Sequence, residues 1–205
     1  MARNTVSSKN SRKAGKKAGA SGEDRTIFFV LAGFTALIIV AIAAAAIIST
    51  VRSNNAAEKF TPNDQGLLKA GSKAPDFSTK TIDGKKVSLA DKGGKKATML
   101  VFFASWCPHC QKEAPVISDF QSQYKDLRIM MIGIDGQDNT GKVQDFVNKY
   151  GINSPATYDP PIGATYKVSG YPTVYVLDGN DKVVAANSGE APREVFEGWI
   201  EKALN

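Results

Sequence analysis

An unbroken apolar segment dominates the N-terminal part of the hydrophobicity pattern. Residues 27–48 carry no charged side chain, and Thr35 is their one polar residue. A helix rises about 1.5 Å per residue, so this segment would reach roughly 33 Å, slightly more than a bilayer's hydrocarbon core of about 30 Å. We therefore expect residues 27–48 to form a transmembrane helix.

A cleaved signal peptide is the alternative for the same segment. The apolar region of a signal peptide usually covers about 7–15 residues, which is shorter than residues 27–48. The run of alanines at 43–46 nevertheless resembles a cleavage site. A membrane anchor is the main expectation, and cleavage stays open as the alternative.

Basic residues gather before the apolar segment. Residues 1–26 hold seven basic and two acidic side chains, a net charge of 7 − 2 = +5. Few large apolar side chains accompany them, so we expect a disordered tail. The positive-inside rule places this tail in the cytoplasm and the bulk of the chain on the other side of the membrane.

The chain beyond the anchor is predicted to contain a linker and one domain. Residues 49–66 are polar and include Pro62, which is typical of a linker. Residues 67–205 are long enough for a domain with its own core. Residues 66–205 hold 17 basic and 16 acidic side chains, a net charge of 17 − 16 = +1. This balance argues against a nucleic-acid partner.

Within the domain, strand-like and helix-like patterns alternate. Continuous apolar runs at residues 98–104 and 128–135 are typical of strands buried on both faces. Apolar residues at helical spacing predict helices over residues 108–124, 140–150 and 192–204. Turn signals predict paired short strands at residues 77–81 with 86–88, and at residues 173–177 with 182–186. The fold class is therefore α/β, with a central mixed sheet flanked by helices and an N-terminal β-hairpin.

The content of cysteine and histidine narrows the chemistry. The chain has two cysteines and one histidine. A structural zinc site needs four protein ligands, so these three side chains cannot complete one. Two cysteines allow a single disulfide, which excludes a multi-disulfide scaffold. We expect the protein to work without a metal or other cofactor.

The two cysteines lie where a buried strand gives way to a helix. The segment Cys107-Pro108-His109-Cys110 follows the apolar run at 98–104 and opens the helix predicted at 108–124. Free backbone N–H groups and the helix dipole favour an anion at this end, so a Cys107 thiolate is stabilised there and attacks. Pro108 fits the first helical turn, where a missing N–H costs little. Cys110 lies one turn further inside as the resolving thiol, and Trp106 can shield the pair.

Other interpretations of the cysteine pair are weaker. The two cysteines could be half of a metal site, but the chain lacks the further cysteine and histidine ligands that would complete it. A structural disulfide would close a ring of four residues and remove little entropy from the unfolded chain. The pattern therefore favours a redox-active pair.

Three features together resemble the thioredoxin-like family over roughly residues 70–205. They are the motif from Trp106 to Cys110, Pro115 in the following helix, and Gly170-Tyr171-Pro172-Thr173 before a strand. The resemblance implies that Pro172 is cis and packs against the cysteines. It also implies that Tyr171 and Pro172 receive an extended substrate peptide.

The chain is most similar to the membrane-anchored, extracytoplasmic TlpA/ResA-like branch of this family. That branch has an extra β–α unit, which we expect over residues 128–150. Its acidic residue after the second cysteine corresponds to Glu113, which the resemblance implies relays protons to Cys110. A plain surface carboxylate is the alternative for Glu113. Val101 replaces the buried aspartate of thioredoxin, which leaves Glu113 as the one nearby carboxylate candidate.

The resemblance also implies a location and partners. We expect a monomer in the plasma membrane of a bacterium, single-pass, with the catalytic domain outside the cytoplasm. Its substrates are exported proteins that carry thiols or disulfides. A membrane redox partner would recycle the cysteine pair.

The direction of exchange is ambiguous in the sequence. The Pro108-His109 pair is the pattern of DsbA-type oxidases, in which a stabilised thiolate makes the disulfide easy to donate. His109 would favour the Cys107 thiolate in the same way, so we expect a slight preference for disulfide donation. The scaffold instead resembles a branch of reductases, and reduction of apocytochrome c or other disulfides is the close alternative.

Two other classes of protein, thiol peroxidases and copper-binding proteins, share single features with this sequence. A thiol peroxidase is suggested by the Asp76-Phe77 opening, but peroxiredoxins carry a threonine where this chain has Ala104. A copper-binding or copper-chaperone protein of the Sco type is possible in principle, since two thiolates bind Cu(I). Sco-like proteins, however, separate their cysteines by three residues and add a distant histidine.

Overall fold

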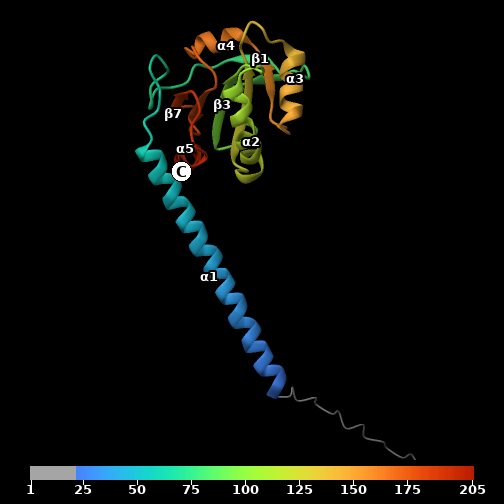
Figure 1. Ribbon diagram of the computed structural model, residues 1–205, viewed down its shortest axis with the longest axis vertical. Helices are drawn as coiled ribbons and strands as arrows, with labels where there is room; N and C mark the ends of the chain where they lie inside the picture. Colours follow the sequence, from blue (N-terminus) through green and yellow to red (C-terminus); the bar gives the residue numbers. More distant parts are fainter. Residues whose placement is uncertain (1–21) are drawn as a thin grey trace, which may run out of the picture. The chain divides into compact units, whose positions relative to one another are not determined.

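The computed structural model describes residues 22–205, and for residues 22–32 it describes the backbone alone (Figure 1). Most of the tail expected over residues 1–26 therefore lies outside the described residues. The chain divides after Ile47 into two compact units. The second unit, residues 48–205, contains the predicted domain.

Helix α1 (Gly22–Lys59) is longer than the predicted transmembrane segment. It contains a stretch that is apolar and long enough to cross a membrane, with exposed large side chains from Phe34 to Val51. The helix continues to Lys59, through the first part of the expected linker, so the end of the helix does not coincide with the expected end of the transmembrane segment at residue 48. Residues 49–59 contain neither proline nor glycine, and no residue before Pro62 stops a helix there.

The last turns of α1 pack within the second unit against α5 (Arg193–Leu204). Ser53 is fully buried, and its hydroxyl donates a hydrogen bond of 3.2 Å to the carboxylate of Glu201. Gly198 makes the close approach possible, because a Cβ atom at this position would lie 2.5 Å from the Cβ of Ala57. The non-helical connection to the domain therefore begins at Phe60.

A mixed five-stranded sheet forms the centre of the domain, as predicted. Its strand order is β5-β4-β3-β6-β7, with β3 parallel to β4 and antiparallel to β6. The strands are β3 (Ala97–Phe103), β4 (Leu127–Gly133), β5 (Ala156–Tyr158), β6 (Thr173–Leu177) and β7 (Val183–Ser188). The predicted N-terminal hairpin is also present, as β1 (Ser78–Lys80) and β2 (Lys86–Ser88).

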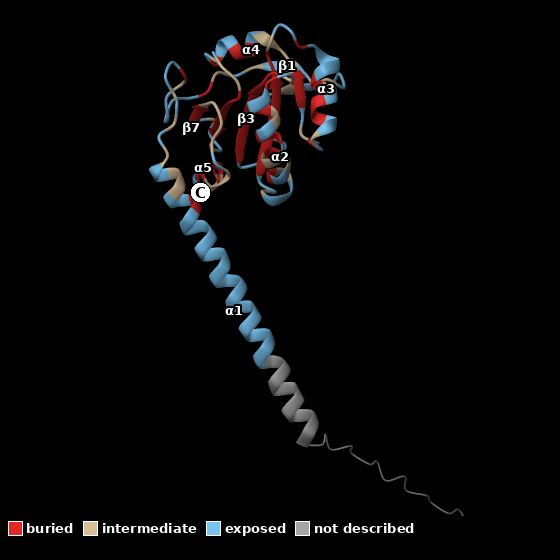
Figure 2. Cartoon of the chain, viewed as in Figure 1, coloured by how far each residue is buried: buried red, intermediate tan, exposed pale blue. Residues whose placement is uncertain are grey.

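Helices cover both faces of the sheet. Side chains along each strand point alternately to the two faces, so one strand contributes to both cores. In β3, Met99 and Val101 pack in the core with α2 (Pro108–Gln123), α3 (Thr140–Lys149) and α5. Leu100 and Phe102 point to the other face, into the core with α4 (Pro160–Thr165). Figure 2 shows the consequence, a sheet whose strands are almost wholly buried. The continuous apolar runs in the sequence arise from this double burial.

The structure contains two β–α units between α2 and β6. The extra unit expected over residues 128–150 is present as β4 and α3, and a second, unpredicted unit follows as β5 and α4. A strand of three residues and a helix of six are too short to produce a recognisable period. Tight packing holds the short helix in place, since a Cβ on Gly163 would lie 2.6 Å from the Ile134 side chain.

Candidate active site

The junction of β3 and α2 positions the two cysteines as the sequence predicts. Cys107 is the N-cap of α2, with an extended backbone, and Pro108 is the first residue of the helix. The amide of Cys107 donates to the carbonyl of Ala104 at 3.1 Å, and its carbonyl accepts from the amide of Gln111 at 3.1 Å. Cys107 therefore lies at the N-terminal end of the helix, where the backbone N–H groups of the first turn have no partners within the helix.

Both cysteines are buried, but their surroundings differ. The Cys107 thiol donates to the backbone carbonyl of Tyr171, with a sulfur–oxygen distance of 3.7 Å. Cys110 lies one turn further along α2 and faces the core. Burial raises the pKa of the Cys110 thiol far above its ordinary value, and the adjacent Cys107 adds to the shift. Cys110 therefore needs a proton acceptor before it can act as a nucleophile.

The Tyr171–Pro172 peptide bond is cis, as expected, and lies directly before β6. Pro172 is buried, whereas Tyr171 is half-buried. This turn places the Tyr171 carbonyl next to the Cys107 sulfur. The backbone that the resemblance assigns to peptide binding thus lies beside the attacking atom.

Glu113 is buried, so it is not a surface carboxylate. It follows Cys110 by three residues and lies one helical turn further along α2. Within the described residues neither of its carboxylate oxygens has a hydrogen-bond partner. Burial is the main cause that raises the pKa of Glu113 to about 8; the charge of Glu190 adds to it, and the backbone of Ala191 opposes it. A carboxyl group with this pKa can take up or release a proton near neutral pH.

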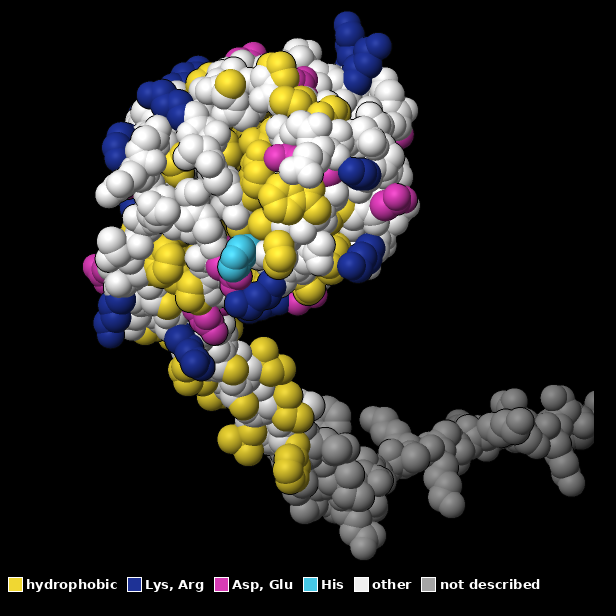
Figure 3. Space-filling model, turned by 45° about the horizontal axis from the view of Figure 1, so that its top comes forward, with side chains coloured by type: hydrophobic (Ala, Val, Ile, Leu, Met, Phe, Trp, Pro, Cys, Tyr) yellow, Lys and Arg dark blue, Asp and Glu magenta, His cyan; other side chains and the backbone are white. Residues whose placement is uncertain are grey.

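His109 lies on the surface, and its ring is engaged by Glu190 rather than free. The Nδ1 atom is 2.6 Å from one carboxylate oxygen of Glu190, and the Lys112 ammonium is 2.5 Å from the other. Lys112 first and His109 second hold the pKa of Glu190 below its ordinary value. Figure 3 shows the single histidine among acidic, basic and apolar side chains. No pattern in the sequence points to Glu190, which lies 81 residues after His109.

Two aspartates that the sequence analysis missed hold the residues before Cys107. Asp138 is buried and accepts from both the amide, at 2.7 Å, and the hydroxyl of Ser105. Asp135 accepts from the indole N–H of Trp106 at 2.9 Å. These two carboxylates bind Ser105 and Trp106, so Glu113 stays the candidate for proton relay to Cys110. Both aspartates follow β4, and the carboxyl ends of parallel strands meet at one edge of a sheet, which is the signal that could have revealed them.

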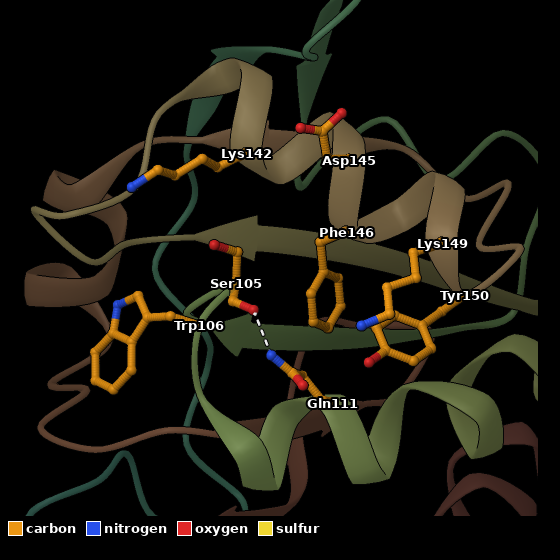
Figure 4. A pocket seen from close by; sticks show the side chains of 8 residues that line it. All are labelled: Ser105, Trp106, Gln111, Lys142, Asp145, Phe146, Lys149 and Tyr150. Atoms are coloured by element: carbon orange, nitrogen blue, oxygen red, sulfur yellow. Dashed lines mark hydrogen bonds between the residues drawn. The ribbon is translucent and has the colours of Figure 1, made fainter.

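A hollow of about 320 Å³ opens beside Trp106, between α2 and α3. Figure 4 shows Phe146 and Tyr150 on one side of the hollow, with Lys142 and Lys149 near its rim. Gln111 closes the α2 side and donates a hydrogen bond of 3.1 Å to the carbonyl of Ser105. The hollow has the size and the aromatic wall to receive a side chain of a bound polypeptide.

The described residues offer little for a metal ion. Among them, no group of three or more histidine, cysteine, aspartate or glutamate side chains is arranged to hold one. The two sulfurs of Cys107 and Cys110 are the softest donors in the site. The site's chemistry, as far as its residues define it, is that of a thiol pair with a nearby carboxyl group.

Comparisons with known proteins agree with this geometry. A model of the AhpC/TSA family matches residues 70–186. The thiol-disulfide oxidoreductase ResA of Bacillus thuringiensis is 34% identical over 141 residues, which cover 68% of this chain and 81% of the relative. The thioredoxin-like protein YneN of Bacillus subtilis is 33% identical over 146 residues, 70% of this chain and 85% of that one.

A solved structure shows the same architecture. The thiol:disulfide interchange protein of the thioredoxin family from Chlorobium tepidum superimposes with a TM-score of 0.59 at 26% identity and covers 67% of this chain and 99% of that one. The cysteine pair at the N-terminus of α2, the cis-proline beside it and these similarities lead to one conclusion. The chain belongs to the AhpC/TSA family and is one of its thioredoxin-like thiol-disulfide oxidoreductases.

Proposed function

We propose that this protein is a membrane-anchored enzyme that exchanges disulfides with exported proteins outside the cytoplasm. The observation that carries the proposal is the asymmetry of the two thiols. Cys107 caps α2 beside the Tyr171 carbonyl, and Cys110 lies behind it with a raised pKa. One sulfur is placed to meet a substrate, and the other to complete the exchange internally.

Exchange in the reducing direction takes two steps. The Cys107 thiolate attacks one sulfur of a substrate disulfide, which forms a mixed disulfide and releases the other substrate sulfur as a thiolate. Cys110 then loses its proton and attacks the Cys107 sulfur, which releases the second substrate thiol. The substrate gains two electrons, and the Cys107–Cys110 pair loses two. Disulfide donation is the same sequence in reverse.

Glu113 is the group we assign to the proton on Cys110. Its pKa of about 8 lies close to neutral pH, where a general acid or base is most effective. The residue lies on the same face of α2 as Cys110 and is shielded from water. In reduction it accepts the Cys110 proton, and in donation it returns one.

For the direction of exchange we propose reduction. The preference for donation rested on His109 favouring the Cys107 thiolate, as its place between the cysteines suggests. The His109 ring instead lies 2.6 Å from the Glu190 carboxylate, which it shares with Lys112, so part of the positive charge of a protonated imidazole is offset. With less of that charge acting on Cys107, the dithiol state is stabilised less and the pair becomes a stronger reductant.

The standard reduction potential of the full chain tests this direction. Reduction predicts a wild-type value near that of thioredoxin, about −270 mV, whereas donation predicts a value close to the roughly −120 mV of DsbA. His109→Ser should shift the potential by less than about 30 mV if Glu190 offsets the imidazole charge. A negative shift of about 30–60 mV in His109→Ser would instead support donation, because it would show that His109 stabilises the thiolate.

The location and partners follow from the same proposal. The basic residues before the apolar segment favour a cytoplasmic N-terminus and an extracytoplasmic domain in a bacterial plasma membrane. Each cycle of reduction leaves the cysteine pair oxidised. A membrane partner must then supply two electrons to the Cys107–Cys110 disulfide.

A further inference from the structure

Asp135 joins two aromatic residues that flank the attacking cysteine. It lies two residues beyond the end of β4 and is half-buried. One oxygen accepts from the indole N–H of Trp106 at 2.9 Å and from the amide of Gln137 at 2.8 Å. The other oxygen accepts from the hydroxyl of Tyr171 at 3.3 Å. A single carboxylate thus connects two segments that are distant in sequence.

The two rings border the access to Cys107. Trp106 precedes the cysteine and keeps 48% of its surface exposed, although it is a large apolar side chain. The Trp106 and Tyr171 rings meet edge to face, with centroids 6.4 Å apart and an interplanar angle of 89°. The Tyr171 carbonyl lies 3.7 Å from the Cys107 sulfur. A polypeptide that brings its disulfide to Cys107 must contact these two residues.

The negative charge of Asp135 strengthens its hydrogen bonds to Trp106 and Tyr171. The hydrogen bond from Trp106 is the main cause that lowers the pKa of Asp135, so the carboxylate is ionised at neutral pH. Hydrogen bonds to an ionised acceptor are about twice as strong as neutral ones. An exposed tryptophan without such a partner would sample several rotamers and would lose that freedom on binding.

We propose that Asp135 is a positioning residue for polypeptide recognition, which holds Trp106 and Tyr171 in the arrangement that a substrate chain binds. The proposal deepens the proposed function, because it takes disulfide-bonded polypeptides as the substrate class. Asp135 does not touch the reacting sulfur atoms. Its effect therefore falls on the affinity for a polypeptide and leaves the chemistry of the thiol pair intact.

The test compares two kinds of substrate with the full-length protein in detergent. Reduction of insulin, a disulfide-bonded polypeptide, and of hydroxyethyl disulfide, a small molecule, is measured with dithiothreitol as the electron source. Asp135→Ala should raise the KM for insulin about tenfold, equivalent to about 1.4 kcal/mol, with kcat changed less than about twofold. The rate with hydroxyethyl disulfide should stay unchanged.

Three variants separate positioning from a general structural role. Asp135→Asn keeps an oxygen for the indole and adds an amide donor toward the tyrosine oxygen, so it should restore most of the insulin KM. Tyr171→Phe removes one of the two hydrogen bonds and should raise that KM by a smaller factor. Asp126→Ala, which removes an exposed carboxylate at the opposite end of β4 from Asp135, is the matched control and should leave the KM within about twofold of wild type.

Two results would overturn the positioning role. One is an equal loss on both substrates in Asp135→Ala, and the other is an insulin KM that none of the Asp135 variants changes. If Asp135→Ala unfolds, Tyr171→Phe still decides, because an unchanged insulin KM in that variant contradicts the proposal. A wild-type protein that reduces hydroxyethyl disulfide but not insulin contradicts the substrate class, and one that reduces neither contradicts the proposed function itself.

Discussion

At the scale of single residues, position in the helix makes two chemically identical cysteines different. Cys107 and Cys110 are three positions apart and both are buried, yet Cys107 is the N-cap beside the Tyr171 carbonyl and Cys110 lies one turn further along α2. Desolvation disfavours the thiolate of the inner cysteine and raises its pKa. Desolvation also raises the pKa of Glu113. A thiol that holds its proton and a carboxyl group that exchanges one near neutral pH therefore lie in the same helix as the sulfur that meets the substrate.

The cysteine roles can be tested by trapping. Cys110→Ser should leave Cys107 able to form mixed disulfides that cannot be resolved internally, so complexes with substrate proteins should accumulate on non-reducing gels. Cys107→Ser should yield few or none, because the raised pKa of Cys110 keeps its thiol protonated. Equal accumulation in the two variants would contradict the assignment.

The buried carboxyl of Glu113 predicts a pH-dependent stability. The folded pKa of about 8 lies above the ordinary value of 4.5, so the folded state holds a proton that the unfolded state releases between these values. Stability contributed by this group is thus full below pH 4.5 and declines up to about pH 8, by at most about 1.4 kcal/mol per pH unit.

Glu113→Gln should remove that decline, so its free energy of unfolding should exceed that of wild type increasingly from pH 5 to pH 8. Denaturant unfolding at several pH values measures the difference. Glu194→Gln, on α5, serves as a control that also removes one carboxylate. An identical pH slope in wild type and Glu113→Gln would mean that Glu113 ionises normally in the folded protein.

At the scale of elements, a glycine decides how two helices meet. The last turns of α1 approach α5 so closely at Gly198 that any Cβ would collide with Ser53 and Ala57. The segment that the sequence marks as a linker is therefore partly a structural element of the domain. Its polar residues can be accommodated at this interface, because the buried Ser53 hydroxyl has hydrogen-bond acceptors in Glu201 and in the carbonyl of Thr50.

Gly198→Ala tests this contact in two backgrounds. In residues 48–205 the added methyl group should destabilise the domain by about 1–2 kcal/mol, because overpacking outweighs the gain in helix propensity. In residues 66–205 the partner helix is missing, and the same change should stabilise α5 by about 0.5–1 kcal/mol. Thermal or denaturant unfolding of the four proteins provides the measurement, and effects of the same sign in both backgrounds would contradict the packing.

At the scale of the whole molecule, the chain combines an apolar helix with a redox domain of nearly neutral charge. The helix displays large apolar side chains along its exposed surface from Phe34 to Val51, which a membrane would cover. The seven basic residues before the apolar segment at 27–48 predict the orientation. The relatives that match the domain are thiol-disulfide oxidoreductases, which suits an enzyme acting on exported proteins.

The orientation can be read with the chain's own thiols. In intact cells, a membrane-impermeant maleimide should label the reduced protein at Cys107, since the domain is expected to lie outside the cytoplasm. Cys107→Ser is the control for background labelling at Cys110. Labelling that requires permeabilised cells would place the domain in the cytoplasm and reverse the predicted topology.

The sequence by itself determined the elements with long or distinctive patterns. The apolar runs at 98–104 and 128–135 predicted β3 and β4, because strands buried on both faces must be apolar throughout. The motif around Cys107 and the Tyr171-Pro172 pair predicted the centre of the site, because their chemistry is local. The short unit of β5 and α4 was not predicted, because segments this short contain no recognisable period.

Tertiary structure alone decided which distant side chains complete the site. Glu190 reaches His109, and Asp135 reaches Trp106 and Tyr171, across separations of more than 25 positions in the sequence. The sequence indicated Glu113 as a candidate but did not show whether it is exposed. The packing of neighbouring elements buries it. The physical reason is general: a residue's type and spacing fix its local conformation, whereas desolvation, charge pairing and hydrogen bonds depend on what the fold brings beside it.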